Sequence, residues 1–310
     1  MSLFSEEQEK RYRCLLGEEF EQFEEACRRP LPTVVRCNTL KVEPEDALSI
    51  LEGEGFQLAP VPWCSYAARV VSGPLSTLGN TLAHFAGVIY LQEGVSLLPV
   101  LALGPQPGET LLDLAAAPGS KTTQAAQEMG DAGAIVANDV SAERLKALAY
   151  HLERLGISSV TVTQMDGRRF GRLTPNAFQK VIADCPCSGE GTVRKDSRAV
   201  QEPSSRARKR LVETQKALLV SAYKAAVPGG RILYSTCTLA PEENEGVVSY
   251  LLDNYRCTTL PIEIPGLVAS RGVEGWEDEE FHPRVVNSLR VYPHQNDTGG
   301  FFLALLEKGM

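Results

Sequence analysis

Two cysteines in this sequence stand where a thiol could take part in a reaction. Cys187 lies in the segment DCPCSGEG (184–191), and Cys237 lies in the segment YSTCT (234–238). Each segment follows a short apolar run that predicts a buried parallel strand. Because ligands of open α/β sheets bind at the carboxyl ends of the strands, we expect both thiols and the carboxylate of Asp184 at one ligand site. This arrangement predicts covalent catalysis, in which the thiolate is the reacting form of cysteine.

Modification of a cytosine at carbon 5 is a reaction that needs these groups. Carbon 5 is inert until a nucleophile adds to carbon 6, and the addition lets carbon 5 accept an electrophilic methyl group. The addition pushes charge to ring nitrogen 3, and an acid close to that nitrogen stabilises it. After methyl transfer, the carbon-5 proton and the thiol must leave. Two cysteines and Asp184 meet these needs. The alternative for any cysteine is a buried apolar side chain, but polar, glycine-rich loops at strand ends favour a reactive role for Cys187 and Cys237.

A third segment, AAAPGSKT (115–122), indicates a binding site for an adenosine-containing cofactor. Its small residues let a ligand approach the backbone, and the helix that follows offers unpaired N–H groups to an anion. A P-loop is unsupported, because alanine stands where its first glycine belongs and serine precedes lysine. Asp139, which ends the next strand, can accept hydrogen bonds from ribose hydroxyls, and Asp166 is placed to contact an adenine. The alternative is that both are surface acids on loops.

The elements that must position these residues alternate from residue 110 onwards, which is typical of a doubly wound, Rossmann-like parallel sheet. The predicted elements are strands at 111–114, 134–137, 160–162, 181–183 and 231–233, helices at 120–129 and 141–155, and a long helix that ends near residue 227. Two later segments, 288–292 and 301–305, predict a closing antiparallel pair. The fold class is therefore α/β, with an antiparallel pair at the end of the chain.

The chain before residue 80 predicts two smaller parts. A helix begins after Ser5, where Gln8 completes a capping box, and Pro30 ends it. A small α+β unit follows; its predicted elements are a strand at 33–37, a helix at 44–51 and a strand at 56–58, with a helix-like stretch after it at 90–103. We therefore divide the chain into an N-terminal helix (1–29), a small α+β module (30–79) and a catalytic domain (80–310).

Charge and composition limit the classes of protein to which the chain can belong. The net charge is −8, but eight acids lie within residues 1–25 and five within residues 274–280, so the rest is close to neutral. No apolar run is long enough to span a bilayer, the acidic N-terminus argues against a secretory signal, and the eight cysteines have no regular spacing. We therefore expect a cytoplasmic protein with no membrane segment and no metal site.

One basic segment allows two interpretations. Its residues could contact RNA phosphates, or they could be solvated charges on a helix face. They are Arg194, Lys195, Arg198, Arg206, Arg208, Lys209 and Arg210.

Five segments carry a family resemblance. They are DLAAAPGSKTT (113–123), VANDVS (136–141), MDGRRF (165–170), DCPCSGEGTVRK (184–195) and YSTCTLAPEENE (234–245). Together they resemble the RNA cytosine-C5 methyltransferases of the Nop2/Sun type, and most of all the bacterial members that act on small-subunit ribosomal RNA. The resemblance extends over VRCNTLK (35–41), LGNTLAHFAGVIYLQE (78–93) and RVYPHQNDTGGFFLALLEK (290–308), so it covers nearly the whole chain in order.

The resemblance implies S-adenosyl-L-methionine as the methyl donor and gives each site residue a role. Asp139 matches the ribose acid, Asp166 the adenine-side acid, and Asp184 the acid beside the cofactor and the target base. Cys237 matches the nucleophile, and Cys187 matches the second cysteine, which assists release. Lys121 is assigned to catalysis as well as to the loop at the methionine end of the cofactor, whose residues are Ala115, Ala116, Ala117, Pro118, Gly119, Ser120 and Lys121.

The substrate implied by the resemblance is RNA. We predict a monomeric enzyme that methylates a cytosine in small-subunit ribosomal RNA, free or in the small ribosomal subunit, with residues 30–79 as an RNA-binding module. Longer bacterial relatives continue into further RNA-binding domains beyond the position of Met310, whereas compact archaeal relatives that act on transfer RNA end near it. Transfer RNA is therefore the second candidate. Two alternatives stay open: a non-catalytic ribosome-assembly factor, and a DNA-type enzyme in which Cys187 is the nucleophile.

Overall fold

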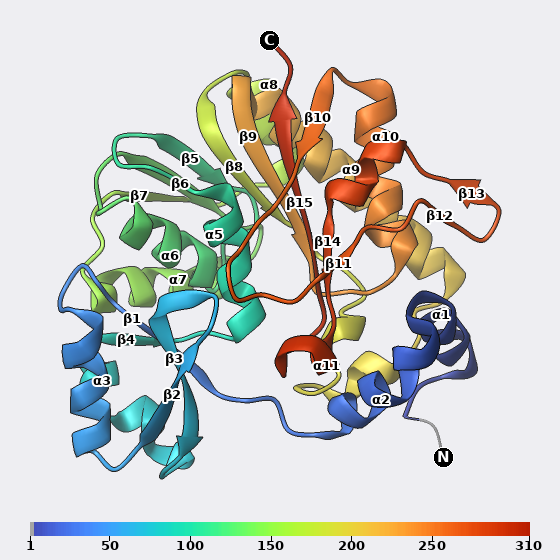
Figure 1. Cartoon of the computed structure of the whole chain (residues 1–310). Coiled ribbons are helices and arrows are strands. Elements are labelled where there is room, and N and C mark those ends of the chain that lie inside the picture. The colour runs from blue at the N-terminus through green and yellow to red at the C-terminus, as the bar shows by residue number, and fades with distance from the viewer. Residues whose placement is uncertain (1–2) are drawn as a thin grey trace.

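The structure, a computed structural model, describes residues 3–310, and its largest element is a mixed sheet (Figure 1). Within those residues its strands are β5 (Thr110–Asp113), β6 (Ala134–Asn138), β7 (Val160–Thr163), β8 (Phe178–Asp184), β9 (Ala226–Thr236), β10 (Cys257–Leu260), β11 (Ser270–Arg271), β14 (Leu289–Val291) and β15 (Phe301–Lys308). Their order is β11-β14-β15-β9-β8-β5-β6-β7, with β10 paired to β15.

The strand directions confirm the predicted fold class. β7, β6, β5, β8 and β9 run parallel, as a doubly wound sheet requires. β15 pairs antiparallel with both β9 and β14, so the predicted closing pair is also confirmed. Parallel strands end at one edge of the sheet, and the segments that follow β5, β6, β8 and β9 therefore meet there.

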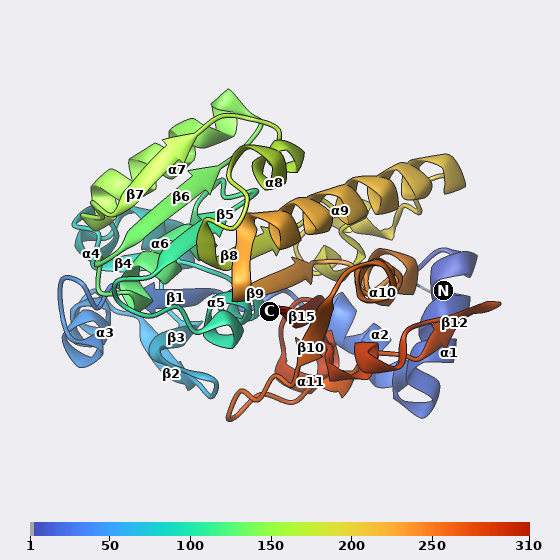
Figure 2. The same ribbon diagram turned by 90° about the horizontal axis from the view of Figure 1, so that it is seen from above.

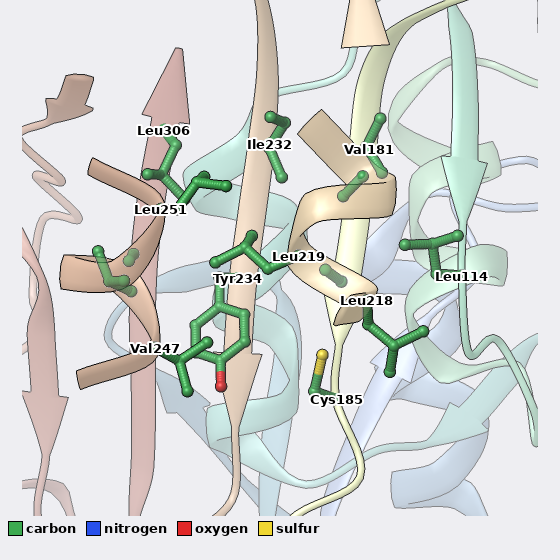
Figure 3. Close-up of a cluster of buried hydrophobic side chains, with 14 of the residues drawn as sticks. Leu114, Val181, Cys185, Leu218, Leu219, Ile232, Tyr234, Val247, Leu251 and Leu306 are labelled. Atoms are coloured by element: carbon green, nitrogen blue, oxygen red, sulfur yellow. The ribbon is translucent and has the colours of Figure 1, made fainter. Parts of the chain in front are cut away.

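Helices cover both faces of this sheet. α9 (Ser205–Ala225) and α10 (Glu245–Asn254) pack on one face, and α5 (Leu98–Leu103) and α6 (Ser120–Glu128) pack on the other, so α9 and α5 lie on opposite sides in Figure 2. Neighbouring residues of β9 point in opposite directions, as expected for a strand buried on both faces. Ile232 and Tyr234 contact the layer of α9 and α10 shown in Figure 3, while Leu233 contacts the other layer.

A separate small sheet has the strand order β2-β3-β1-β4. Its strands and the helices beside it are β1 (Val34–Cys37), β2 (Gln57–Val61), β3 (Cys64–Ser72), β4 (Ile89–Leu91), α3 (Pro44–Gly53) and α4 (Leu82–Phe85). β1, α3 and β2 were expected, but β3 was not. The prediction of a helix over 90–103 is wrong at its start, where β4 pairs with β1. The module boundary at residue 79 stays a prediction, although β4 lies beyond it.

The N-terminal segment forms two helices, so the prediction of one helix over 1–29 is wrong. α1 (Glu6–Leu16) ends at Gly17, whose φ of +53° lies in the left-handed region, and α2 (Phe20–Arg28) follows a single 3₁₀ turn. The predicted capping box of Ser5 and Gln8 is confirmed. Phe23 of α2 packs on Tyr292 and Tyr12 of α1 packs on Phe23, so both helices lie on the catalytic domain and far from the small sheet (Figure 1).

The remaining elements are α7 (Ala142–Leu155), α8 (Phe170–Leu173), α11 (Pro293–Asn296), the hairpin of β12 (Gly275–Trp276) and β13 (Glu279–Glu280), and short 3₁₀ helices that include Glu190–Thr192, Ser197–Val200 and Pro241–Glu243. In the described part of the chain, no helix combines the length and apolar character needed to cross a membrane. Nor do residues 3–310 gather three or more His, Cys, Asp or Glu side chains in a way that could hold a metal ion.

Candidate active site

A cavity of about 590 Å³ opens at the carboxyl edge of the large sheet. Its walls come from the segments that follow β5, β6, β7, β8 and β9, together with α9 and the start of β15. The predicted residues that line it are Ala115, Ala117, Pro118, Lys121, Asp139, Asp166, Asp184 and Cys237. The other predicted residues are not among its lining residues but belong to the same loops; they are Ala116, Gly119, Ser120 and Cys187.

The loop after β5 has little room for larger side chains. Gly119 has a φ of +112°, and a Cβ atom there would lie 2.7 Å from Leu148 Cδ1 of α7. Ala116 N donates a hydrogen bond of 2.7 Å to Asn138 O, which ties the loop to the end of β6. α6 begins at Ser120, and the first N–H groups of a helix have no partner within it. The loop therefore suits the anionic end of a ligand.

Asp139 is buried with one oxygen atom that accepts no hydrogen bond. Its Oδ1 accepts from Ser141 N at 2.9 Å. Its Oδ2 lies 3.1 Å from Arg144 Nη1 but accepts no hydrogen bond from the protein. Buried carboxylate oxygens usually accept at least one hydrogen bond, and a ligand hydroxyl at the cavity wall could donate it to Asp139 Oδ2. This oxygen, which is ion-paired with Arg144 but accepts no hydrogen bond, fits the ribose of the predicted cofactor.

Asp166 also reaches the cavity, but both of its oxygens are already engaged. They accept hydrogen bonds of 2.9 Å each from Arg168 Nε, and Oδ1 caps Arg168 N at 3.0 Å. These bonds lower the pKa of Asp166 below its usual value. The adenine-side role of Asp166 therefore stays a prediction, and it would require Arg168 to share the carboxylate.

Lys121 and Asp184 form an ion pair beside Cys237. Lys121 Nζ lies 2.7 Å from Asp184 Oδ2, and Ser235 Oγ donates a 2.7 Å hydrogen bond to Asp184 Oδ1. Burial alone would lower the pKa of Lys121, but the charge of Asp184 and its hydrogen bond raise it above the usual value. Lys121 is therefore a cation at neutral pH, and the pair can hold or move a proton at the cavity wall.

The two cysteines predicted to react lie side by side. Cys187 Sγ and Cys237 Sγ are 3.4 Å apart, and of these two Cys237 lines the cavity, as does the neighbouring Cys185. The hydrogen bond with Cys237, together with burial, raises the pKa of Cys187 well above its usual value. Cys187 is therefore a neutral thiol at neutral pH, placed to donate a hydrogen bond to the sulfur of Cys237.

Their neighbours hold the two loops together. The hydroxyl oxygens of Ser188 and Thr238, the residues that follow the cysteines, are 2.7 Å apart. Gly191 N donates to Cys237 O at 2.9 Å. A Cβ atom at Gly191 would lie 2.3 Å from Gly300 O, so the loop can approach β15 only with glycine there. The sulfur distance is therefore maintained by contacts on both sides.

The basic segment divides into two groups, and neither interpretation fits all of it. Arg194 and Arg208 are structural: Arg194 donates to Thr298 O at 2.9 Å and to Pro30 O at 2.7 Å, while Arg208 pairs with glutamates in the interior. Arg198 is exposed but pairs with Asp196 at 2.8 Å. The exposed residues without such a role are Lys195, Arg206, Lys209 and Arg210. The last three border a shallow hollow that shares Thr214 with the main cavity.

Several residues at the site were missed by the sequence analysis. Glu93, Ser96, Arg144 and Phe301 line the cavity. Arg36 of β1 is buried and donates to Ser120 O at 2.9 Å and Thr123 Oγ1 at 2.8 Å, so the small sheet supports the start of α6. Glu93 accepts from Gly299 N at 3.0 Å, and burial raises its pKa. Arg36, Glu93 and Phe301 lie in segments that carry the family resemblance, but no local pattern assigns a role to any of the missed residues.

Comparison with known proteins identifies two matching family models. Residues 100–307 match the model described as 16S rRNA methyltransferase RsmB/F, and residues 4–94 match the N-terminal domain of 16S rRNA methyltransferase RsmF. The chain is 44% identical over 296 residues to ribosomal RNA small subunit methyltransferase F of Klebsiella pneumoniae (strain 342), covering 93% of this chain and 60% of that protein. The corresponding protein of Erwinia tasmaniensis is 41% identical over 300 residues, with 94% and 60% covered. The chain thus spans about three fifths of the length of these curated relatives.

Solved structures agree with the fold. A methyltransferase homolog from Pyrococcus horikoshii has a TM-score of 0.86 and 35% identity, covering 96% of this chain and 93% of that chain. NSun6 from the same organism also has a TM-score of 0.86, at 23% identity, covering 100% and 99%. The latter supports the fold alone. Since the RsmB/F model matches two thirds of the sequence, the chain belongs to the RsmB/F family of 16S rRNA methyltransferases, which confirms the resemblance found in the sequence.

Proposed function

We propose that this chain methylates carbon 5 of a cytosine in small-subunit ribosomal RNA, with S-adenosyl-L-methionine as the methyl donor. The observation that carries the proposal is the pair of sulfur atoms 3.4 Å apart, one of them opening into a cavity that also holds the Lys121–Asp184 pair. Methyl transfer to an exocyclic amino group of a base would not require a nucleophilic thiol. Family membership supports the methyltransferase activity and the cofactor.

The residues of the cavity fit the proposed cofactor. Asp139 would hold the ribose through Oδ2, which accepts no hydrogen bond from the protein, and the loop 115–121 with the start of α6 would hold the methionine end. A cavity of about 590 Å³ has room for a cofactor and a base beside it. When bound, the cofactor supplies an electrophilic methyl group.

Attack on the base falls to Cys237. Its thiolate adds to carbon 6, and the electron pair of the carbon 5–carbon 6 double bond moves toward carbon 5, conjugated with the ring. Lys121 and Asp184 lie next to the thiol, so they can lend a proton to ring nitrogen 3 and take it back later. Carbon 5 then takes up the methyl group.

Release falls to Cys187. The carbon-5 proton passes to water, its electron pair forms the carbon 5–carbon 6 double bond, and the bond from carbon 6 to Cys237 Sγ breaks with its pair on sulfur. The neutral thiol of Cys187, 3.4 Å away, stabilises the departing thiolate by a hydrogen bond. The proton taken by nitrogen 3 returns to the Lys121–Asp184 pair, so the site ends as it began.

The target base must leave its stack to reach the cavity, and the exposed Arg206, Lys209 and Arg210 would meet phosphates near it. We propose a monomer that works on ribosomal RNA in the cytoplasm. Transfer RNA is the second candidate, and a non-catalytic assembly factor is the third. Transfer RNA receives less support because the matching relatives carry the name of the ribosomal enzyme. The non-catalytic factor receives less support because the cysteines and the ion pair of the site are all present.

The test is methyl transfer from radiolabelled S-adenosyl-L-methionine to small ribosomal subunits, free 16S RNA and transfer RNA transcripts, with the position mapped by bisulfite sequencing. We expect one 5-methylcytosine in the ribosomal RNA. Efficient methylation of transfer RNA alone would show that transfer RNA, and not ribosomal RNA, is the substrate. Cofactor binding with no transfer to any RNA would favour the assembly factor.

A further inference from the structure

The first helix of the chain reaches into the loop that carries Cys187. Arg11 of α1 has only 2% of its side chain exposed, and its Nη1 lies 2.8 Å from Glu190 Oε1. Its Nη2 lies 2.8 Å from Glu202 Oε1, and the hydroxyl of Tyr12 donates to Glu190 Oε2 at 3.1 Å. Two neighbouring residues of α1 thus hold a glutamate three positions after Cys187.

A second arginine extends this contact to the backbone beside Cys187. Arg208 of α9 shares Glu190 and Glu202 with Arg11, and its Nη1 lies 3.2 Å from Glu243 Oε1. The other oxygen of Glu243 accepts from Ser188 N at 2.9 Å and from Gln215 Nε2 at 2.9 Å.

Gln215 completes the connection from the other side. Its Nε2 also donates to Pro186 O at 2.9 Å, so the residues immediately before and after Cys187 are both held by this network. Because Glu190 and Glu243 are almost fully buried, their charges are tolerable only when paired. Loss of Arg11 would leave Arg208 to pair with Glu190, Glu202 and Glu243 together, so that buried negative charge would be in excess beside the loop.

Cys237 is bonded to the Cys187 loop through Gly191 N, but it also has supports of its own. Asn244 accepts a hydrogen bond of 2.6 Å from Thr236 Oγ1 and donates one of 3.0 Å to Thr238 O, on either side of Cys237. β9 itself is fixed by its pairing with β8 and β15. These supports do not involve Arg11, so loss of Arg11 should displace Cys187 more than Cys237.

We infer that Arg11 is a positioning residue for Cys187, and that α1 completes the part of the site that releases the product. Arg11 acts through Glu190, Arg208 and Glu243 and does not touch the substrate. The inference rests on the proposed function. It predicts that loss of Arg11 slows release while attack and methyl transfer continue.

The test compares Arg11→Met with Arg13→Met, which removes an exposed arginine of the same helix that contacts Glu9 and Glu21 instead. The readouts are methyl transfer in a single turnover, steady-state turnover, and covalent protein–RNA adduct on a denaturing gel. For Arg11→Met we expect single-turnover transfer within about threefold of wild type, steady-state turnover roughly tenfold to a hundredfold lower, and accumulated adduct. Arg11→Lys should restore part of the turnover, and Arg13→Met should behave as wild type.

An equal fall of both rates without adduct would overturn the inference, because a merely destabilised enzyme loses both steps together. So would wild-type behaviour of Arg11→Met. If Arg11→Met does not fold, Glu243→Gln, which keeps the size of the side chain and removes its charge, gives the same readouts with the same expectations. A wild-type protein that methylates no RNA would instead reject the proposed function, and the inference with it.

Discussion

The two halves of the cavity are built in different ways. The half assigned to the cofactor comes mostly from one strand–helix–strand run, from β5 to Asp139, with the loop 115–121 at its centre. The half that holds the thiols joins the ends of β8 and β9, and contacts as far away in the sequence as Arg11 hold it in place. One continuous run of the chain, with Arg36 as a distant support, therefore shapes the first half, and long-range contacts between buried charges shape the second. The two halves should respond differently to substitution.

Loss of the nucleophile should have the largest effect. We expect Cys237→Ser to lower turnover at least about a thousandfold, because a serine hydroxyl cannot replace the thiolate that forms the covalent bond. Cofactor affinity should not change, since the other half binds the cofactor. Turnover and calorimetry measure the two effects, and Cys14→Ser, at an exposed thiol, is the control. Equal turnover of the two variants would rule out Cys237 as the nucleophile.

Loss of the ribose acceptor should have the opposite pattern. Asp139→Ala removes a charge-assisted hydrogen bond, which contributes about 1.5–3 kcal/mol, so the affinity for S-adenosyl-L-methionine should fall at least about tenfold. Saturating cofactor should restore most of the methyl transfer. Asp131→Ala, which removes an acid bound to Ser158 and Ser159, is the control. Unchanged affinity in a folded Asp139→Ala protein would contradict the role of Asp139.

A buried acid in the cofactor half should make stability depend on pH. Burial raises the pKa of Asp113 to about 6, although Thr122 donates to it at 2.7 Å. A raised folded-state pKa means that the protonated acid favours the folded state, so its contribution is full below pH 4 and is lost as the pH rises through 6. Between pH 4.5 and pH 7 the loss is about 2 kcal/mol.

The measurement is urea unfolding of wild type and Asp113→Asn at both pH values. The free energy of unfolding of Asp113→Asn, relative to wild type, should rise by about 2 kcal/mol between pH 4.5 and pH 7. A difference that does not depend on pH would show that Asp113 does not titrate in this range.

The exposed basic residues of α9 should have the smallest effect. Lys209→Ala should weaken RNA binding a few-fold and lower the slope of log affinity against log salt by about 1. The control is Lys224→Ala, because Lys224 lies on the same helix but near its other end, away from the cavity. It should leave the slope unchanged. Equal slopes for Lys209→Ala and wild type would mean that RNA does not follow this face.

The sequence predicted the local parts of the molecule and missed the long-range ones. The strand at 111–114, the helix at 120–129 and Asp139 follow from apolar periodicity and from strand-end position, and they lie where expected. Arg208 was grouped with surface charges because its neighbours are basic, yet it is buried among glutamates. Arg11 lies in an acidic segment, where the spacing suggests only the local partner Glu7. Its other partners, Glu190 and Glu202, are 179 and 191 residues away. Ion pairs between distant segments leave no periodic pattern, so only the folded chain reveals them.

The central claim is that Cys237 attacks the base and Cys187 releases it. The most direct measurement is a denaturing gel of labelled substrate RNA mixed with wild type, Cys187→Ala, Cys237→Ala and the double variant in the presence of S-adenosyl-L-methionine. We predict a slow-migrating protein–RNA band that accumulates with Cys187→Ala and is missing from Cys237→Ala and the double variant. A band that forms with Cys237→Ala and disappears with Cys187→Ala would contradict the claim and make Cys187 the nucleophile.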